Sequence, residues 1–171
     1  MGISSAVFDI DGTLANVKHR LHFLRCRPKN WDAFFDLAHR DTPIEQGRSK
    51  IHEAIEAGLT VVYLTGRPEK TRQATVEWLA KHRFPAACNG NLFMRPEGDY
   101  RPASRVKVEL LRRARDRVGD VHVIYDDDEA VIQSLRRAGY NCIHVSWMES
   151  SDAEAGALSE AQESDATDCQ A

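Results

Sequence analysis

The feature that most constrains the fold of this 171-residue chain is a regular alternation of short apolar runs with helical patterns. Continuous runs rich in β-branched residues are typical of strands covered on both faces, and they lie at residues 6–8, 61–64, 121–125 and 142–145. Helical patterns lie at about 45–57, 68–83, 104–118 and 128–138. This alternation predicts an α/β fold, a doubly wound, Rossmann-like parallel sheet with helices on both faces.

The predicted helix boundaries follow from glycine and proline. Gly58 and Gly139 stand where two of the helical patterns should end, as C-terminal caps do. Pro68 and Glu69 stand where another should begin, because proline fixes a helical φ and an acid favours the positive end of the helix dipole.

One segment, residues 16–44, does not fit the alternation. It begins with a basic stretch at 18–29, and Asn30 is then a candidate N-cap for a short helix over 31–37. We expect a small helical cap insertion over the carboxyl ends of the strands, within one domain that spans 1–148.

The charge of the chain is divided unevenly. Residues 149–171 hold seven acids and no lysine or arginine, with few large apolar residues, so we expect an acidic disordered tail. The remaining 148 residues carry 19 acids against 23 bases, a formal charge of +4. A mildly basic body is compatible with a polyanionic partner but does not require one.

Several classes of protein are disfavoured. No stretch approaches the roughly 18 apolar residues of a membrane span, and the N-terminus lacks the pattern of a signal peptide. The four cysteines form no CxxC pair, which argues against a disulfide framework or a structural zinc site. We therefore expect a cytoplasmic protein with no membrane association.

Carboxylates follow two of the predicted strands. Asp9 and Asp11 follow the first, and Asp126 and Asp127 follow the run at 121–125. Because ligands of open α/β sheets bind beyond the carboxyl ends of the strands, these acids should meet there. Acids that are crowded together require a cation, and an all-oxygen ligand set favours Mg²⁺.

Groups suited to a phosphate follow the strand at 61–64 and open the helix at 104–118. Thr65 offers a hydroxyl, while Arg67 and Lys107 offer positive charge. A carboxylate can attack phosphorus to form an aspartyl-phosphate, and a metal ion helps an anionic nucleophile to approach an anionic group.

The motifs DIDGT, TGR, a lone lysine and DD, in this order, resemble those of the haloacid dehalogenase (HAD) phosphatase superfamily. The resemblance covers about residues 5–147, so residues 1–148 would form the phosphatase domain. It implies that Asp9 is the nucleophile, that Asp11 is the general acid and then the base, and that Lys107 bridges Asp9 and the phosphoryl group. Thr65 would hold a phosphate oxygen.

The same resemblance implies a Mg²⁺ site. Asp127 would be a direct ligand, and Asp126 a second or water-mediated one. Asp9 would share the metal, and Asp11 would contribute its backbone carbonyl.

A closer resemblance is to the 3'-phosphatase domain of phage-type polynucleotide kinase/phosphatase. It rests on FDIDGTLANVKHR, TGRPEKTRQATVEWL, YRPASRVKVELL and YDDDEAVIQSLRRAGYNCIHV. It implies that Arg20 and Arg67, with Gly66 of the TGR motif, bind or support the substrate phosphate. The match weakens at 21–44, and no GxxxxGK[ST] phosphate loop of a kinase occurs.

Other interpretations remain for several of these residues. Arg20 and Lys107 both lie among other basic residues and could belong to solvated faces. Trp31, Phe34 and Phe35 could form the core of the insertion or a platform on which bases stack. Asp128 is better suited to capping the following helix than to binding metal.

Three functions are therefore considered. The first is a Mg²⁺-dependent phosphatase that removes 3'-phosphate from nucleic acid ends in repair, because a small insertion leaves a site open to a chain end. The alternative is a phosphatase of a mononucleotide or other small metabolite, with an apolar insertion sealing the site. A nucleic-acid binding module without catalysis is disfavoured, because it would not need Asp9, Asp11, Lys107 and Asp127 together.

Overall fold

The computed structural model describes residue 2 and residues 4–148. The predicted acidic tail at 149–171 lies outside the described residues.

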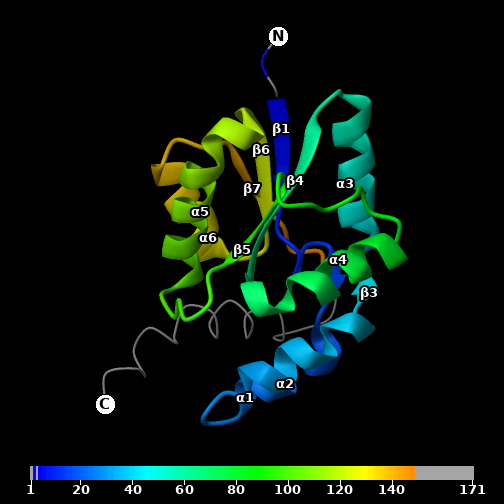
Figure 1. The fold of residues 1–171 in the computed structure, drawn as a ribbon, viewed down its shortest axis with the longest axis vertical. Coiled ribbons are helices and arrows are strands. Elements are labelled where there is room, and N and C mark those ends of the chain that lie inside the picture. The colour runs from blue at the N-terminus through cyan, green and yellow to red at the C-terminus, as the bar shows by residue number, and fades with distance from the viewer. Residues whose placement is uncertain (1, 3, 149–171) are drawn as a thin grey trace.

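A five-stranded parallel sheet forms the centre of the domain (Figure 1). Its strands, in the order β5-β4-β1-β6-β7, are β5 Leu92–Arg95, β4 Thr60–Pro68, β1 Ser4–Phe8, β6 Asp120–Asp126 and β7 Cys142–His144. The central strand β1 pairs with β4 on one side and with β6 on the other, so that Phe8 lies opposite Tyr63 of β4 and Tyr125 of β6. The predicted doubly wound α/β fold is confirmed.

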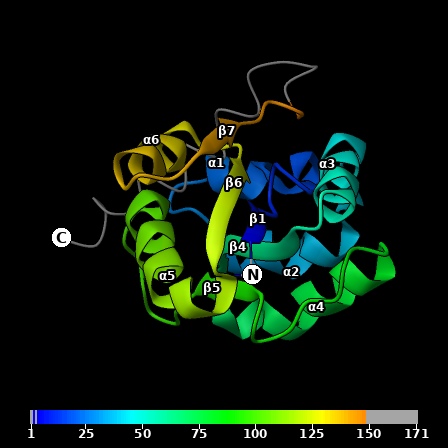
Figure 2. The same ribbon diagram turned by 90° about the horizontal axis from the view of Figure 1, so that it is seen from above.

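Helices cover both faces of the sheet (Figure 2). One pair is α3 Glu45–Glu56 and α4 Arg72–Lys81, and the other is α5 Ala103–Val118 and α6 Glu129–Arg137. Side chains alternate along β1, since Ala6 and Phe8 pack in the core under the first pair and Val7 in the core under the second. This explains why the strand is apolar at consecutive positions.

Two details of the sheet differ from the sequence prediction. The edge strand β5 was not predicted, because it is only four residues long and has loops on both sides. The helix predicted to start at Pro68 begins instead at Arg72. Strand β4 continues to Pro68 and a 3-10 turn at Glu69–Thr71 follows, so Pro68 ends a strand rather than opening a helix.

The segment between β1 and α3 lies beyond the carboxyl ends of the strands (Figure 1). Short antiparallel strands, β2 Ala15–Asn16 and β3 Thr42–Pro43, close its base. Between them lie two 3-10 turns, Lys18–Arg20 and Leu37–Arg40, and two helices, α1 His22–Arg25 and α2 Trp31–Asp36. The segment has an apolar core of its own, formed by Val17, Leu21, Leu24, Phe34, Ile44 and Met148. Asn30 caps α2 as predicted, its side chain accepting from the Ala33 amide.

Candidate active site

The chain leaves β1 in a tight turn that aims two acids at the same edge of the sheet. Asp9 continues the ladder, its amide donating to the Tyr125 carbonyl at 2.9 Å, and Asp11 follows. Both acids are 3% exposed. Gly12 has φ +84°, and a Cβ there would lie 1.9 Å from Oδ2 of Asp127. The glycine of the DIDGT motif is therefore required both by the turn and by the neighbouring acid.

Lys107 joins two of the buried acids. Its Nζ lies 2.8 Å from Oδ1 of Asp9 and 2.7 Å from Oδ2 of Asp126. Burial opposes the charge on Lys107, but the carboxylates of Asp126 and Asp9 outweigh it and raise the pKa of its ammonium. The lysine is 1% exposed, so the structure excludes the interpretation of Lys107 as part of a solvated helix face.

Three carboxylates are gathered around this lysine. Asp9, Asp126 and Asp127 each place an oxygen within 4.8 Å of the others. Burial raises the pKa of Asp9 to about 8 in spite of Lys107, with Asp126 and Asp11 contributing in the same direction. Burial, together with Asp9 and Asp126, raises the pKa of Asp127 well above its ordinary value. One ammonium does not balance two buried carboxylates and a third that is partly buried, so the donor set fits a hard divalent cation such as Mg²⁺.

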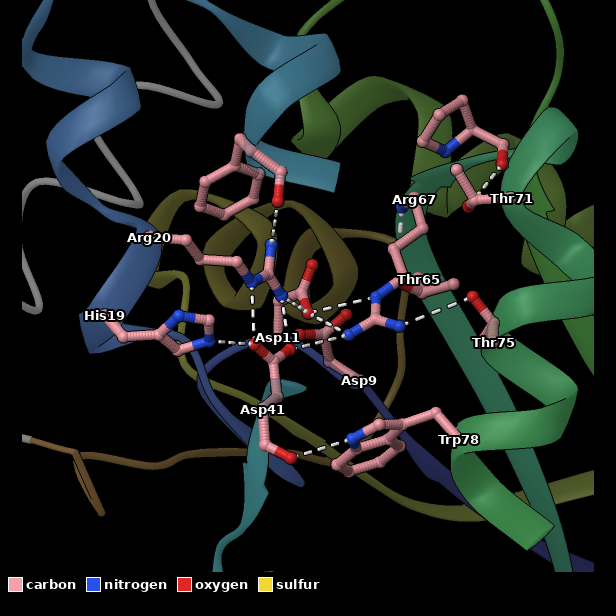
Figure 3. A network of polar contacts seen from close by, with 12 residues as sticks. Asp9, Asp11, His19, Arg20, Asp41, Thr65, Arg67, Thr71, Thr75 and Trp78 are labelled. Carbon is pink, nitrogen blue, oxygen red and sulfur yellow. Dashed lines mark hydrogen bonds and ion pairs between the residues drawn. The ribbon is translucent and has the colours of Figure 1, made fainter. Parts of the chain in front are cut away.

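The Asp11 carboxylate is absent from this cluster and lies among arginines instead (Figure 3). Its Oδ1 accepts from Nη2 of Arg20 at 2.7 Å and from Nη2 and Nε of Arg67 at 2.6 and 3.0 Å. Burial alone would raise its pKa, but the charges of Arg20 and Arg67 outweigh it and hold the pKa of Asp11 at about 2. Two acids separated by one residue therefore have opposite environments.

Arg20 is 0% exposed, which excludes the interpretation of this residue as part of a solvated basic face. Its guanidinium lies 4.0 Å from the centroid of the Phe34 ring, and Nη1 donates to the Phe34 carbonyl at 3.3 Å. Arg25 and Arg27, by contrast, are exposed on the insertion and stand outside the buried network.

Arg20 and Arg67 bind a second buried carboxylate besides Asp11, that of Asp41, which the sequence analysis missed. Its oxygens accept from Nε and Nη2 of Arg20 at 2.8 and 2.5 Å and from Nη2 of Arg67 at 3.1 Å. His19 Nε2 lies 2.8 Å from Oδ1, and Trp78 Nε1 donates to the backbone carbonyl at 2.9 Å (Figure 3). The only sequence signal is indirect, since two buried guanidiniums require more negative charge than Asp11 supplies.

The TGR motif lies in the last part of β4. Thr65 is fully buried, and its Oγ1 accepts from the Arg67 amide at 3.2 Å. The side chains of Thr65 and Arg67 lie close to Asp9 and Asp11 (Figure 3). The carbonyl of Gly66 accepts from Nε of Arg95 at 3.1 Å, which joins this turn to β5.

The structure thus brings the predicted candidates to one edge of the sheet, as two adjoining groups. One group is acidic around a lysine: Asp9, Asp126, Asp127 and Lys107. The other is a network of two arginines and two carboxylates: Asp11, Arg20, Asp41 and Arg67. Asp128 caps α6, its side chain accepting from the amides of Ala130 and Val131, as its position predicted.

The three aromatic residues of the insertion have different surroundings. Phe34 is buried in the core of the insertion. Trp31 and Phe35 are only partly buried and line a pocket together with the end of β4. Phe34 therefore belongs to the core of the insertion, Trp31 and Phe35 pack against that core, and their use as a platform for bases stays a prediction.

Comparisons with known proteins show which family this domain is similar to. Residues 4–149 match the polynucleotide kinase PNKP phosphatase domain. Two solved structures, the Pnkp1/Rnl/Hen1 complex and the Pnkp1/Rnl/Hen1 RNA repair complex, each contain a chain that is 26% identical, with TM-scores of 0.68 and 0.70. The matches cover 83% and 84% of this chain, but 45% and 42% of those chains, so this chain spans less than half their length.

More distant structures share the fold. The class C acid phosphatase from Bacillus anthracis is 12% identical with a TM-score of 0.63, the match covering 94% of this chain and 78% of that one. A haloacid dehalogenase-like hydrolase from Streptococcus pneumoniae is 13% identical with a TM-score of 0.60, covering 95% and 92%. The comparison with curated proteins gave no match. Among the described residues, no helix is long and apolar enough to cross a bilayer. The chain belongs to the haloacid dehalogenase phosphatases, in the family of the polynucleotide kinase PNKP phosphatase domain.

Proposed function

We propose that this domain is a Mg²⁺-dependent phosphomonoesterase that removes the 3'-phosphate from polynucleotide ends through an aspartyl-phosphate on Asp9. The observation that carries the proposal is the position of Asp9. It is held at 2.8 Å by the Lys107 ammonium, and two buried arginines lie on the carboxylate two residues further on. This arrangement offers one nucleophile together with cationic groups for a dianionic phosphate.

In the first step, a carboxylate oxygen of Asp9 attacks phosphorus and the bond from phosphorus to the leaving 3'-oxygen breaks. Asp11 gives its proton to that oxygen. In the second step, Asp11 takes a proton from water, whose oxygen attacks phosphorus. The acyl-phosphate bond then breaks, which releases inorganic phosphate and restores Asp9.

Asp9, Asp126 and Asp127, with the backbone carbonyl of Asp11, would hold Mg²⁺. The ion supplies the positive charge that lets an anionic nucleophile approach an anionic phosphate. Lys107 keeps Asp9 in place and contributes further positive charge.

The arginine network controls the stage at which Asp11 takes up a proton from solvent. Without substrate, Arg20 and Arg67 hold its pKa at about 2, which suits a base but not an acid. A phosphate would compete for the same guanidinium donors, since charge-assisted bonds from arginine to phosphate are strong. When these donors turn to the phosphate, the pKa of the buried Asp11 rises and the residue can carry the proton to the leaving group.

The polynucleotide substrate is supported by the family and by the basic charge on the insertion. The related chains belong to complexes described as Pnkp1/Rnl/Hen1, one of them an RNA repair complex. The insertion, which we propose acts as a small cap, carries exposed basic residues such as Arg25 and Arg27. These charges suit phosphates next to the one that reacts.

The alternative is a phosphatase of mononucleotides or other small phosphate esters. The pocket lined by Trp31 and Phe35 favours it, because apolar walls suit a small ligand. The two functions share their catalytic residues and differ in what is held beyond the reacting phosphate.

A side-by-side assay tests the proposal. Rates with Mg²⁺ are measured on a 3'-phosphorylated oligonucleotide, the same oligonucleotide with a 5'-phosphate, and a panel of mononucleotides. We expect the highest kcat/KM on the 3'-phosphorylated oligonucleotide. A clear preference for mononucleotides would establish the alternative, and no hydrolysis of any of them would refute the phosphomonoesterase proposal.

A further inference from the structure

The pocket lined by Trp31 and Phe35 adjoins the proposed catalytic edge. Its volume is about 270 Å³, and it lies where helix α2, the end of β4 and the loop 95–101 after β5 meet. Its apolar walls come from Trp31, Phe35, Pro68 and Tyr100. None of these residues takes part in the buried network around Asp11.

The aromatic walls are suited to a flat ring. The rings of Trp31 and Phe35 are stacked, with centroids 5.6 Å apart and planes 19° from parallel. Tyr100 comes from the loop after β5 and is 69% exposed, although it is a large side chain. Because the Tyr100 ring is exposed, a ligand in this pocket can pack against it and bury apolar surface of both.

The charged residues of the pocket do not select an anion. The lining contains three acids and three bases, and several of them are paired with each other. Lys70 Nζ lies 2.6 Å from Asp32, and Arg101 Nη2 lies 2.6 Å from Asp99. The Arg95 guanidinium donates to backbone carbonyls of the adjoining turns, among them that of Asp99 at 2.9 Å. A balanced lining with aromatic walls fits a neutral planar ring better than a phosphate.

The pocket shares one residue with the TGR motif, whose residues are proposed to bind the substrate phosphate. Gly66 lines it, while the flanking Thr65 and Arg67 place their side chains beside Asp9 and Asp11 (Figure 3). The Lys70–Asp32 ion pair also joins the insertion to the turn after β4 at the rim of the pocket. The pocket therefore reaches the turn that carries the proposed phosphate-binding residues Thr65 and Arg67.

We propose that this pocket holds the nucleobase of the nucleotide that carries the reacting phosphate, with Trp31, Phe35 and Tyr100 as its stacking surface. The inference rests on the proposed function, because it assigns the base of that substrate to a site. It makes these three aromatic residues positioning residues for the substrate. Since every base has a π-face, stacking of this kind gives affinity without strong sequence preference.

The test compares an oligonucleotide with a 3'-phosphate on a normal terminal nucleotide with one whose terminal nucleotide lacks its base. Truncation of a stacking aromatic costs about 1–3 kcal/mol per base, which is about 5- to 150-fold in affinity. We expect Tyr100→Ala and Trp31→Ala each to raise KM for the normal substrate within that range, with kcat less affected. Neither variant should alter KM for the abasic substrate, which should already be high in the wild-type domain.

Two variants control for structural damage. Tyr100→Phe retains the ring and should keep the wild-type KM. Ile55→Ala removes an apolar side chain that is also exposed, at 47%, but lies in α3 away from the pocket, and it should change neither substrate. If Tyr100→Ala and Trp31→Ala leave KM unchanged, or raise it equally for both substrates, the pocket is not a base site.

A binding measurement without catalysis separates this inference from the proposed function. Adenosine and ribose are titrated into the metal-free domain, and binding is followed by NMR shifts of the tryptophan indole signals. We expect adenosine to shift the Trp31 signal, ribose to leave it unchanged, and Tyr100→Ala to weaken the adenosine response. Adenosine binding in a domain that hydrolyses no 3'-phosphate would support the pocket and refute the function. Hydrolysis of 3'-ends with no adenosine response and no effect of base removal would refute the pocket alone.

Discussion

Arg67 donates to Asp11 from 56 positions away in the sequence, its Nη2 lying 2.6 Å from the carboxylate Oδ1. Arg20 reaches the same oxygen at 2.7 Å from the other side. The residue proposed as general acid is thus held ionised until something competes for its arginines. This makes proton transfer dependent on the arrival of a phosphate and leads directly to the first prediction.

Asp11→Asn should lower kcat on a 3'-phosphorylated oligonucleotide by about 10²–10⁴-fold, the usual contribution of general acid–base catalysis. The loss should be smaller for an ester such as p-nitrophenyl phosphate, because its leaving group needs no proton. Steady-state rates on both substrates check this. Equal losses on the two esters would mean that Asp11 does not protonate the leaving group.

Asp41→Asn keeps the shape of the side chain and removes the second charge that balances Arg20 and Arg67. Breaking a buried ion pair costs about 3–5 kcal/mol, and we expect about 3 because asparagine retains one acceptor oxygen. Urea unfolding measures this loss. Mg²⁺ affinity should be nearly unchanged, since Asp41 lies outside the acidic cluster. A loss of Mg²⁺ binding free energy as large as the loss of unfolding free energy would indicate general damage to the domain.

The acidic cluster predicts how pH and metal act on stability. Burial raises the pKa of Asp9 from an ordinary 3.8 to about 8 in the folded domain. Between these values the folded state binds more protons than the unfolded state, so metal-free stability falls as pH rises from about 4 to 8. Mg²⁺ binds the deprotonated acids, so its stabilising effect should be larger at pH 8 than at pH 6. Thermal unfolding in EDTA and in Mg²⁺ at both pH values measures this.

Asp127→Asn is the matched variant for that experiment. Removing one of the crowded carboxylates should stabilise the metal-free domain at pH 8, while Mg²⁺ should stabilise it much less than the wild type. Destabilisation of the metal-free variant at pH 8, or a Mg²⁺ effect that does not depend on pH in the wild type, would contradict the assignment of this cluster.

The basic surface of the insertion predicts a dependence on salt. Phosphates neutralised by Arg25 and Arg27 release counterions, so KM for a 3'-phosphorylated oligonucleotide should rise with salt more steeply than KM for a 3'-mononucleotide. Replacing both arginines with alanine should flatten the slope for the oligonucleotide and leave turnover of the mononucleotide nearly intact. Equal slopes for the two substrates in the wild-type domain would favour the small-molecule alternative.

The parts of the fold that could be predicted are those encoded locally. The strand ending at Phe8 and the acids after it are continuous in sequence, and the rule that parallel strands end at one edge was enough to bring Asp9 near Asp126. The short edge strand β5 was missed because four residues between loops carry almost no periodic signal. Pro68 was misread because the strand passes through a residue that also suits a helix start.

The parts of the site that could not be predicted depend on tertiary burial. The resemblance to the 3'-phosphatase family singles out Arg20, but composition and spacing do not distinguish it from the exposed Arg25, because the difference in burial arises only when the insertion folds over β1. The role of Asp41, which is to balance the charge of Arg20 and Arg67, is visible only once both arginines are buried beside it. The pocket at Trp31 likewise depends on a distant loop, since Tyr100 lies 69 positions further along the chain.

The central claim is that Asp9 forms a bond to phosphorus, and trapping that bond tests it most directly. The domain is mixed with Mg²⁺ and substrate, treated with borohydride during turnover, and analysed by peptide mass spectrometry. An acyl-phosphate is reduced to the alcohol, so the account predicts homoserine at position 9, absent without substrate and absent in Asp9→Asn. Unmodified Asp9 during rapid turnover, or homoserine at another acid, would contradict it.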